Sequence, residues 1–368
     1  MLLEFISLIN FKNYEESKLS FSAHLNCFLG QNGSGKTNLL DAIHYLALCK
    51  SANNYSDNQL INHNETYFML KGEFSHEGEK QLVEAAVVSR KPKVFKHNSV
   101  PYEKLSEHIG KIPLVMVAPN DTDLIREGSE FRRKFIDGIL AQVDAPYLSQ
   151  LLEYNRYLKS RNALLKHFFE TRSFDKDLLE SYDDKLLPLN HSIHGSRKKM
   201  MEEFIPIFNE LYEFISESKE VVDLDYKSGV SEEEFDLMFE KSLQHDLNSL
   251  RTNKGIHKDD FKFTIGGYEL KKFGSQGQQK SFVLALQLAK QKFLELKKGF
   301  KPILLLDDIF DKLDDDRIKK LLDLIGDGSL GQVFLTDANP KRTQDHIKSV
   351  RSEVCIFTVE KGIAIKNG

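Results

Sequence analysis

Residues 30–37 read Gly-Gln-Asn-Gly-Ser-Gly-Lys-Thr, which satisfies the pattern G-x-x-x-x-G-K-[ST] at every fixed position. The short apolar run Leu25–Leu29 before it predicts a strand. Thr37–Cys49 after it carries apolar residues at helical spacing, which predicts a helix. Strand, glycine-rich loop and helix in this order are the context that a phosphate-binding loop requires, which argues against a chance match.

This loop has the residue types that triphosphate chemistry needs. Glycines let backbone N–H groups turn inward around phosphate oxygens, and the start of the following helix adds partial positive charge. Lys36 would reach the β- and γ-phosphates, and the Thr37 hydroxyl would ligate Mg²⁺. The residues expected to bind ATP are therefore Gly30, Gln31, Asn32, Gly33, Ser34, Gly35, Lys36 and Thr37.

A second motif supplies carboxylates. Ile303–Leu306 is fully apolar, as in a strand buried on both faces, and it ends at Asp307 and Asp308. Asp307 would help to hold Mg²⁺, and Asp308 would orient or deprotonate the attacking water. Alone, the pair could equally be a turn or a helix cap, but together with the glycine loop it favours catalysis.

The third motif, Ser275-Gln276-Gly277-Gln278-Gln279, precedes a helix predicted at about 277–297. Ser275 and the backbone amides at Gly277 and Gln278 would suit a γ-phosphate, and such a signature distinguishes ABC-type ATPases from other phosphate-loop proteins. The alternative is an ordinary helix cap with Ser275 as the N-cap residue. The position of this motif shortly before the Asp-Asp strand favours the functional interpretation.

Strand and helix signals divide the chain into three stretches. Residues 1–120 contain the strand Leu2–Phe11, the glycine loop, an antiparallel meander at 66–102 and a strand at 114–118. Residues 121–299 are mostly helical and end in the signature motif, and residues 300–368 return to strands, including 333–337 and a terminal hairpin from Val354. The predicted fold is α/β: an ABC-type P-loop ATPase head with an antiparallel β edge subdomain and an inserted helical lobe.

Composition limits the function classes. Lys and Arg total 51 and Asp and Glu total 55 among 368 residues, so the net charge of −4 requires a local basic patch for any DNA contact. Cys27, Cys49 and Cys355 are scattered, which predicts neither disulfides nor a metal site and fits a reducing cytosol. The N-terminus alternates like a strand rather than a signal peptide, and no run of 18 apolar residues predicts a membrane span.

The motifs together resemble the RecF family, relatives of the SMC heads among ABC-type ATPases. The resemblance covers essentially the whole chain, and the SQGQQ signature with Asp-Asp in place of Asp-Glu is fairly specific to this family. The matching segments are LINFKNY at 8–14, GQNGSGKTNLLDAI at 30–43, PNDTDLIREGSEFRRKFID at 119–137, GIHKDD at 255–260, FGSQGQQKSFVLALQLA at 273–289, LLLDDIFDKLDDDR at 304–317 and QVFLTD at 332–337.

The resemblance implies a mechanism and partners. Two subunits would sandwich two ATP molecules, each glycine loop facing the partner's signature at Ser275–Gln278, with Asp311–Asp314 as a D-loop at the interface. ATP would promote homodimerisation on single-stranded or gapped DNA, and weak, DNA-stimulated hydrolysis would release it. The family acts with RecR and RecO to load RecA, and supports replication-fork recovery and the SOS response, which places the protein in the cytoplasm at the nucleoid.

Some positions depart from the wider patterns. Ile256 and Lys258 stand in GIHKDD where relatives often have Pro and Arg, and Asp259 and Asp260 receive no role from the sequence. The strand that ends in a switch His in ABC transporters ends here in Thr336-Asp337, so no γ-phosphate sensor is predicted there. Asn120 is a weak candidate for the Q-loop.

Weaker signals carry two interpretations each. Lys12 would contact nucleotide phosphate as basic residues near this position do in related heads, or it is a solvated surface lysine. The basic clusters 132–134 and 197–199 would bind DNA phosphates, or they are solvated helix faces. Tyr154, Tyr157 and Phe168 would stack on bases, or at their helical spacing they belong to a core.

Three rival functions stay open. A transporter's nucleotide-binding subunit is disfavoured by the long helical insertion, the missing switch His and the SQGQQ signature. A long-armed SMC-type structural protein needs far longer heptad segments than this chain has. A DNA clamp or scaffold that uses ATP without hydrolysing it would show ATP turnover unaffected by Asp308→Asn.

Overall fold

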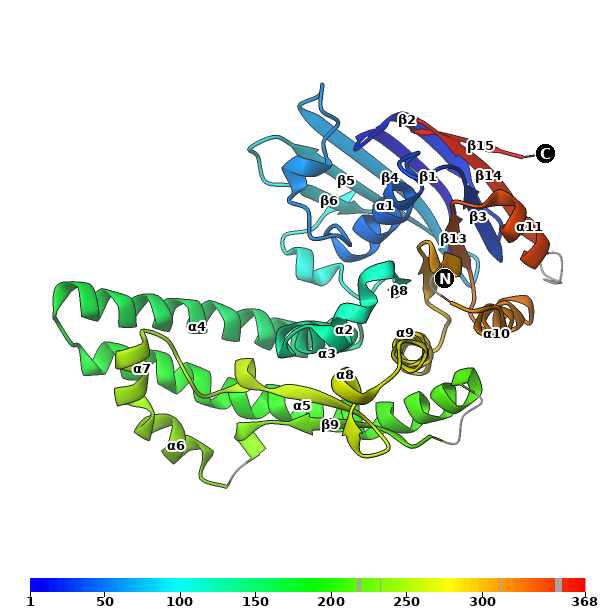
Figure 1. Cartoon of the computed structure of the whole chain (residues 1–368). Helices are drawn as coiled ribbons and strands as arrows, with labels where there is room; N and C mark the ends of the chain where they lie inside the picture. The colour runs from blue at the N-terminus through cyan, green and yellow to red at the C-terminus, as the bar shows by residue number, and fades with distance from the viewer. Residues whose placement is uncertain (217–219, 232, 312, 348–352, 368) are drawn as a thin grey trace. The chain divides into compact units, whose positions relative to one another are not determined.

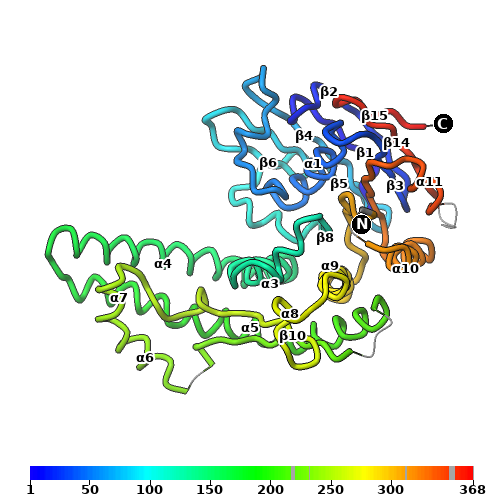
Figure 2. The backbone as a smooth tube through the Cα atoms, viewed as in Figure 1, coloured from blue at the N-terminus to red at the C-terminus, as the bar shows by residue number. Residues whose placement is uncertain are grey.

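The structure, a computed structural model, describes residues 1–216, 220–231, 233–311, 313–347 and 353–367. Two compact units divide the chain, and Figures 1 and 2 trace its course through them. The first unit comprises Met1–Thr122, Phe214–Glu217 and Lys280–Gly368, and the second comprises Asp123–Glu213 and Ser218–Gln279. Each unit has elements of its own and is described separately.

The first unit contains an antiparallel sheet that follows from alternating sequence. Its strand order is β2-β1-β4-β5-β6-β7. Along β4 the side chains of Phe68, Leu70 and Phe74 are fully buried while their neighbours face outward, as a period of two requires. The strands are β1 (Leu2–Phe11), β2 (Tyr14–Ser20), β4 (Tyr67–His76), β5 (Glu79–Val88), β6 (Val94–His97) and β7 (Val100–Pro101). The meander at 66–102 is confirmed, and the sequence interpretation missed β2.

The second sheet of this unit is mainly parallel and carries the chemistry. Its order is β15-β14-β3-β13-β12-β8, and only β15 runs antiparallel. The strands are β3 (Leu25–Leu29), β8 (Leu114–Val117), β12 (Ile303–Leu306), β13 (Val333–Asp337), β14 (Val354–Glu360) and β15 (Ile363–Lys366). Every residue of β3, β12 and β13 is buried, which explains why these strands are mostly apolar and why β12 is apolar throughout. Strand β13 separates β3 from β12, so the two motif-bearing strands are not neighbours.

Helix α1 (Lys36–Leu48) packs between the two sheets, because one hydrophobic core contains its apolar face together with residues of both. Leu39, Ile43 and Leu46 belong to this core, and the helix begins directly at the last glycine of the loop. The other helices of this unit are α10 (Asp315–Gly326) and α11 (Pro340–Ile347). The core therefore fixes the direction in which α1 presents its first turn.

The second unit is mostly helical and carries a small sheet that the sequence interpretation missed. Its antiparallel sheet has the order β11-β10-β9, with β9 (Val222–Lys227), β10 (Asp260–Ile265) and β11 (Tyr268–Glu269). Its helices are α2 (Asp123–Arg126), α3 (Ser129–Val143), α4 (Ala145–Thr171), α5 (Lys176–Ser216), α6 (Phe235–Lys241), α7 (Leu243–Ser249) and α8 (Leu270–Phe273). Helix α9 (Gln276–Lys298) starts in this unit and continues in the first from Lys280.

Short 3₁₀ turns complete the element list at Asp57–Leu60, Leu105–Glu107, Pro119–Thr122, Gly229–Ser231, Ile256–Lys258 and Ile309–Asp311. Cys27, Cys49 and Cys355 are buried free thiols. None of the helices in the described part of the chain combines the length and apolar character that a membrane crossing requires.

Candidate functional site

The glycine loop joins β3 to α1 and is fixed by close backbone approach. Gly35 has a φ of 118°, and a Cβ there would lie 2.6 Å from Asn13 Nδ2. At Gly30 a Cβ would lie 2.2 Å from the carbonyl oxygen of Val359 in β14. Only glycine fits at these two positions, so the loop is held tightly against its neighbours.

Two polar side chains of the loop are poised for an anion. Lys36 is only 4% exposed and curls back, so that its Nζ donates to the carbonyl oxygens of Gly30 at 2.8 Å and Gln31 at 3.1 Å. The buried Ser34 Oγ makes no hydrogen bond to any residue that the structure describes. A buried hydroxyl without a partner and an ammonium bound only by neutral carbonyls fit the phosphate oxygens of a nucleotide.

The two sequence motifs meet at one carboxylate. Thr37 Oγ1 donates to Asp307 Oδ1 at 2.9 Å, which joins the start of α1 to the end of β12. Both residues were predicted to hold Mg²⁺, and the structure brings them together. Hydroxyl and carboxylate oxygens are the ligands that Mg²⁺ prefers, so this pair fits that ion.

Thr336, near the end of the intervening strand β13, links the Asp307 carboxylate to the backbone of Asp308. Its Oγ1 donates to Asp307 Oδ1 at 2.7 Å and accepts from the backbone N–H of Asp308 at 2.9 Å. Asp308 has a left-handed backbone with a φ of 43°, a conformation that non-glycine residues rarely adopt. The sequence interpretation saw at this strand end only a missing His and gave Thr336 no role.

The neighbouring Asp337 has a different task. It is fully buried, and its carboxylate accepts hydrogen bonds from Arg342 and from the Thr343 hydroxyl at the start of α11. This carboxylate anchors α11 to the sheet.

Lys12 lies in the turn between β1 and β2 and forms an ion pair with Asp41. Its Nζ lies 2.6 Å from Asp41 Oδ2, and the Lys12 side chain is only 11% exposed. Asp41 also accepts hydrogen bonds from Ser51 and from the backbone N–H of Ala52. A phosphate contact by Lys12 stays a prediction, and this structure directs its charge to Asp41.

The signature motif forms a capping box at the start of α9 in the second unit. The Gln278 N–H donates to Ser275 Oγ at 3.2 Å, while the Ser275 N–H donates to Gln278 Oε1 at 2.6 Å. The alternative interpretation of Ser275, as the N-cap residue of this helix, is therefore confirmed. Ser275 is nevertheless exposed, and Gly277 and Gln278 are half-buried, so a partner molecule can approach this helix start.

The predicted D-loop, Asp311–Asp314, is described only in part. Lys312 and the Asp311 side chain lie outside the described residues, while Asp314 caps α10 by accepting from the Arg317 N–H at 3.1 Å. Asn120, the Q-loop candidate, is exposed on the turn after β8.

In the two basic clusters of the second unit, Arg132 and Arg197 are paired with carboxylates, whereas Lys198 and Lys199 are exposed. Arg132 forms a two-pronged ion pair with Asp260, with Nε at 2.7 Å from Oδ1. Arg197 is 1% exposed, and its Nη1 lies 2.7 Å from Asp259 Oδ2. The prediction that Arg197 contacts DNA phosphates is wrong, because a buried, paired guanidinium cannot reach a ligand. For the other members of the two clusters a phosphate contact stays a prediction. These pairs also give Asp259 and Asp260 the roles that sequence alone did not supply.

Two of the three α4 aromatic residues that were candidates for base stacking are buried, whereas Tyr157 is half-buried and its stacking on bases stays a prediction. Tyr154 is 1% exposed and donates to, or accepts from, His257 Nδ1 at 2.7 Å, and Phe168 is 5% exposed. For these two residues the core interpretation is correct.

A cavity of about 700 Å³ opens beside the glycine loop in the first unit. Gly30–Ser34 form one wall, and residues of the β14–β15 hairpin and the start of α11 form others, among them Thr358, Lys361 and Pro340. The loop thus borders open space large enough for a ligand.

Comparison with known proteins agrees with this site. The family model described as RecF/RecN/SMC N terminal domain matches residues 2–364. The chain is 44% identical over 359 residues to the DNA replication and repair protein RecF of Flavobacterium johnsoniae, covering 98% of this chain and 100% of that relative. It is 44% identical over 362 residues to the RecF of Parabacteroides distasonis, covering 98% of each.

Solved structures give the same result. The recombination mediator protein RecF-ATPrS in the RecFOR pathway superposes with a TM-score of 0.90 at 32% identity, covering 100% of this chain and 98% of that one. The Smc head domain of Pyrococcus furiosus superposes with a TM-score of 0.57 at 19% identity, covering 99% of this chain and 95% of that one, which shows a shared fold alone. The fold is that of an ABC-type ATPase head, and the chain belongs to the RecF family.

Proposed function

We propose that this protein is an ATP-dependent DNA-binding protein of recombinational repair that closes as a homodimer around two ATP molecules. One observation carries the proposal: the Thr37–Asp307 hydrogen bond of 2.9 Å unites the glycine loop and the carboxylate strand in one site. The relatives named for DNA replication and repair, and the likeness to a nucleotide complex of RecF, support a role for this protein in DNA repair.

Each residue at the site has a proposed task. The backbone N–H groups of residues 30–37 surround the phosphates, and Lys36 exchanges its two carbonyl contacts for phosphate oxygens. Thr37 and Asp307 hold Mg²⁺, which when bound offsets phosphate charge. Asp308 accepts a proton from the attacking water.

The second half of each site comes from the partner copy in this proposal. Ser275 and the helix-start amides at Gly277 and Gln278 would cap the γ-phosphate bound to the other subunit. Ser275 is exposed at this helix start, and its hydroxyl and the Gln278 N–H would exchange their mutual hydrogen bond for contacts with the phosphate. Hydrolysis is weak and DNA-stimulated, and RecO, RecR and RecA are the proposed partners at gapped DNA, in the cytoplasm at the nucleoid.

The test is the mass of the purified protein with and without Mg-ATP and gapped DNA. Wild type should double its mass with Mg-ATP, whereas Lys36→Met should bind no nucleotide and stay single. Ser275→Arg should bind nucleotide normally and also stay single, because the added side chain occupies the space of the γ-phosphate. A wild-type protein that remains a single copy when saturated with Mg-ATP and DNA contradicts the proposal.

Hydrolysis is tested separately. Asp308→Asn should keep ATP binding and dimerisation while ATP turnover falls by about 100-fold or more, the usual contribution of a general base. Unchanged turnover would favour the clamp that uses ATP without hydrolysing it.

A further inference from the structure

The loop between α7 and β10 in the second unit carries three cations on a rigid base. Arg251, Lys254 and Lys258 lie within this loop, which runs from residue 250 to residue 259. Arg251 and Lys258 are exposed, and Lys254 is half-buried. We call these three residues the cationic loop.

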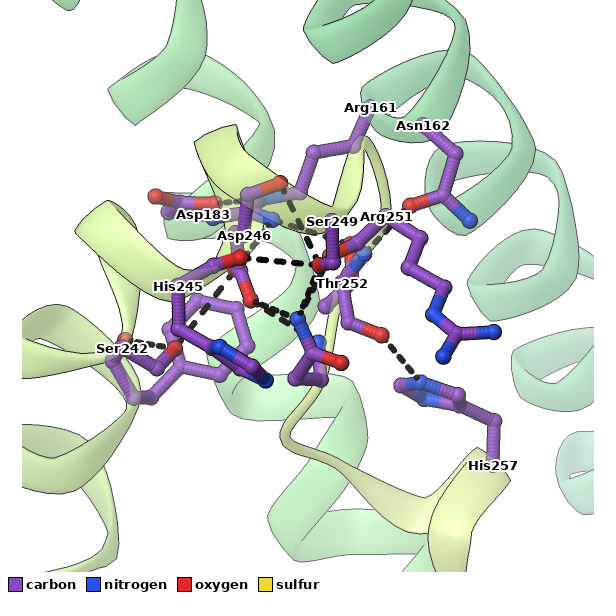
Figure 3. A network of polar contacts seen from close by, with 12 residues as sticks. Arg161, Asn162, Asp183, Ser242, His245, Asp246, Ser249, Arg251, Thr252 and His257 are labelled. Atoms are coloured by element: carbon purple, nitrogen blue, oxygen red, sulfur yellow. Dashed lines mark hydrogen bonds and ion pairs between the residues drawn. The ribbon is translucent and has the colours of Figure 1, made fainter.

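The base of the cationic loop is held by buried hydrogen bonds (Figure 3). Asn162 Oδ1 accepts from both the N–H and the hydroxyl of Thr252, at 2.7 and 2.8 Å. Asp246 Oδ1 accepts from the N–H and the side-chain amide of Asn253, both at 2.9 Å. Arg161 in turn binds Asp246 at 2.8 Å, and both side chains are almost completely buried.

The other end of the loop is fixed equally firmly. His257 lies between the Tyr154 hydroxyl at 2.7 Å and the Thr252 carbonyl at 3.0 Å. The Ile256 N–H donates to Asn190 Oδ1 at 2.9 Å. A loop ordered at both ends presents its cations in one arrangement, so little conformational freedom is lost when a ligand binds.

The acids around the loop face inward and are already paired. Asp246 and Asp259 have fully buried side chains, bound to Arg161 and Arg197 respectively. No carboxylate in the described part of the chain forms an ion pair with a member of the cationic loop. In Figure 3 the Arg251 guanidinium extends away from the network and takes part in none of its drawn bonds.

A fourth cation, Arg133, adds to the positive electrostatic potential at the cationic loop. Arg133 Nη1 donates to the Asp259 carbonyl oxygen at 2.7 Å, which places this guanidinium beside the Lys258 end of the loop. Burial, and then the positive charges of Arg251 and Arg133, lower the pKa of Lys258. These like charges repel one another in the free protein. A bound polyanion would relieve this repulsion, which favours binding.

We propose that the cationic loop binds the phosphodiester backbone of DNA without reading its sequence. Cations without carboxylate partners on an ordered loop suit the phosphates of a nucleic-acid backbone, contacts that position a protein on DNA but carry no sequence information. Tyr154, the aromatic residue at the base of the loop, is buried, so backbone contact rather than base stacking is expected. The proposal rests on the proposed function and adds the DNA-contact surface that its site did not supply.

The test compares two variants that remove equal charge from the second unit. The test variant is Arg251→Gln/Lys254→Gln/Lys258→Gln. The matched control is Lys185→Gln/Lys241→Gln/Lys271→Gln, three exposed lysines of α5, α6 and α8 that lie outside both basic clusters. Binding of a fluorescein-labelled gapped duplex is followed by anisotropy with Mg-ATP at several salt concentrations. ATP affinity is measured on the same samples and should be unchanged in both variants.

The test variant should bind DNA about 10- to 100-fold more weakly at physiological salt. Its plot of log Kobs against log salt should be less steep by about 2.7, since each lost phosphate contact contributes about 0.9. The control should stay within about threefold of wild type, because charges off the contact surface act only through a screened field. Equal losses in test and control overturn the proposal, as does a test variant with the wild-type salt slope.

A second arm distinguishes DNA from a small phosphate ligand. Labelled inorganic polyphosphate replaces the duplex, and a test variant that loses polyphosphate binding but keeps DNA binding overturns the proposal. If wild type dimerises with ATP and binds no DNA, both this surface and the DNA part of the proposed function fail. If wild type binds DNA through the cationic loop but never dimerises, only the proposed ATP mechanism fails.

Discussion

Replacing Thr336 by Val removes one hydroxyl from the centre of the proposed catalytic site and keeps the shape of the side chain. That hydroxyl donates to Asp307 Oδ1 at 2.7 Å and accepts from the Asp308 N–H at 2.9 Å, and Thr336 is fully buried. A hydrogen bond to a charged group contributes about 1.5–3 kcal/mol, and an unsatisfied buried N–H costs about 1–3 kcal/mol. The free energy of unfolding should fall by about 2.5–6 kcal/mol.

The catalytic effect follows from the backbone of Asp308. Its left-handed conformation, with a φ of 43°, costs about 1–3 kcal/mol and persists only where neighbours hold it. Without the Thr336 hydroxyl as acceptor, the backbone of Asp308 should leave the left-handed conformation. The Asp308 carboxylate would then no longer be oriented toward the attacking water. Since a positioned base contributes about 10²–10⁴-fold, losing part of its alignment should lower kcat about 10- to 100-fold.

The assay is steady-state ATP turnover with DNA, alongside ATP affinity by fluorescent-nucleotide titration and thermal unfolding. Thr336→Val should change the ATP affinity by less than about threefold, because Lys36 and the loop amides are untouched. Thr336→Ser keeps the hydroxyl and should recover most of kcat. Equal losses in the Val and Ser variants would refute the reasoning, since keeping the hydroxyl would then give no advantage over losing it.

Three further predictions follow from the same contacts. Lys36→Ala should weaken ATP binding about 100-fold in the nucleotide titration, because it removes a charge-assisted phosphate contact worth about 1.5–3 kcal/mol; unchanged affinity would contradict the assignment of this lysine. Arg161→Met should lower the free energy of unfolding in urea by about 3–5 kcal/mol, since it leaves Asp246 buried without its partner at 2.8 Å, and a loss under about 1 kcal/mol would contradict this. Burial lowers the pKa of His108 to about 4, so the unfolded chain binds more protons between about pH 6.5 and 4 and stability falls as the pH drops through that window. His108→Gln should flatten the pH dependence of urea unfolding there by up to about 3 kcal/mol, and an unchanged slope would contradict the prediction.

The parts of the site with a local signature could be predicted from sequence. The glycine loop needs glycines at fixed spacing because a Cβ at Gly35 would strike Asn13, and that demand is visible in the sequence. The strand Ile303–Leu306 is apolar throughout because both its faces are buried, which also shows in the sequence. Its two aspartates follow at the strand end, so their place at the sheet edge could be inferred.

Features that depend on tertiary order could not be predicted. Thr336 is one threonine at a strand end, and its role exists only because β13 lies between β3 and β12. Arg197 belongs to a basic run that suggests solvent, and its partners Asp137 and Asp259 are 60 and 62 residues away in the chain. The strand Val222–Lys227 is short and half-exposed, with charged outward positions, so its alternation was too weak to stand out.

The order of strands explains why the site needs a second hydroxyl. Thr37 and Thr336 both donate to Asp307 Oδ1, and Oδ2 accepts no hydrogen bond from any residue that the structure describes. If Thr37 turns its hydroxyl to a bound Mg²⁺, as proposed, it can no longer orient this carboxylate. Thr336 remains, because it reaches Asp307 from β13 and does not belong to the glycine loop. Strand β13, which separates the two motifs, thus supplies the hydroxyl that would orient the Asp307 carboxylate when Mg²⁺ binds.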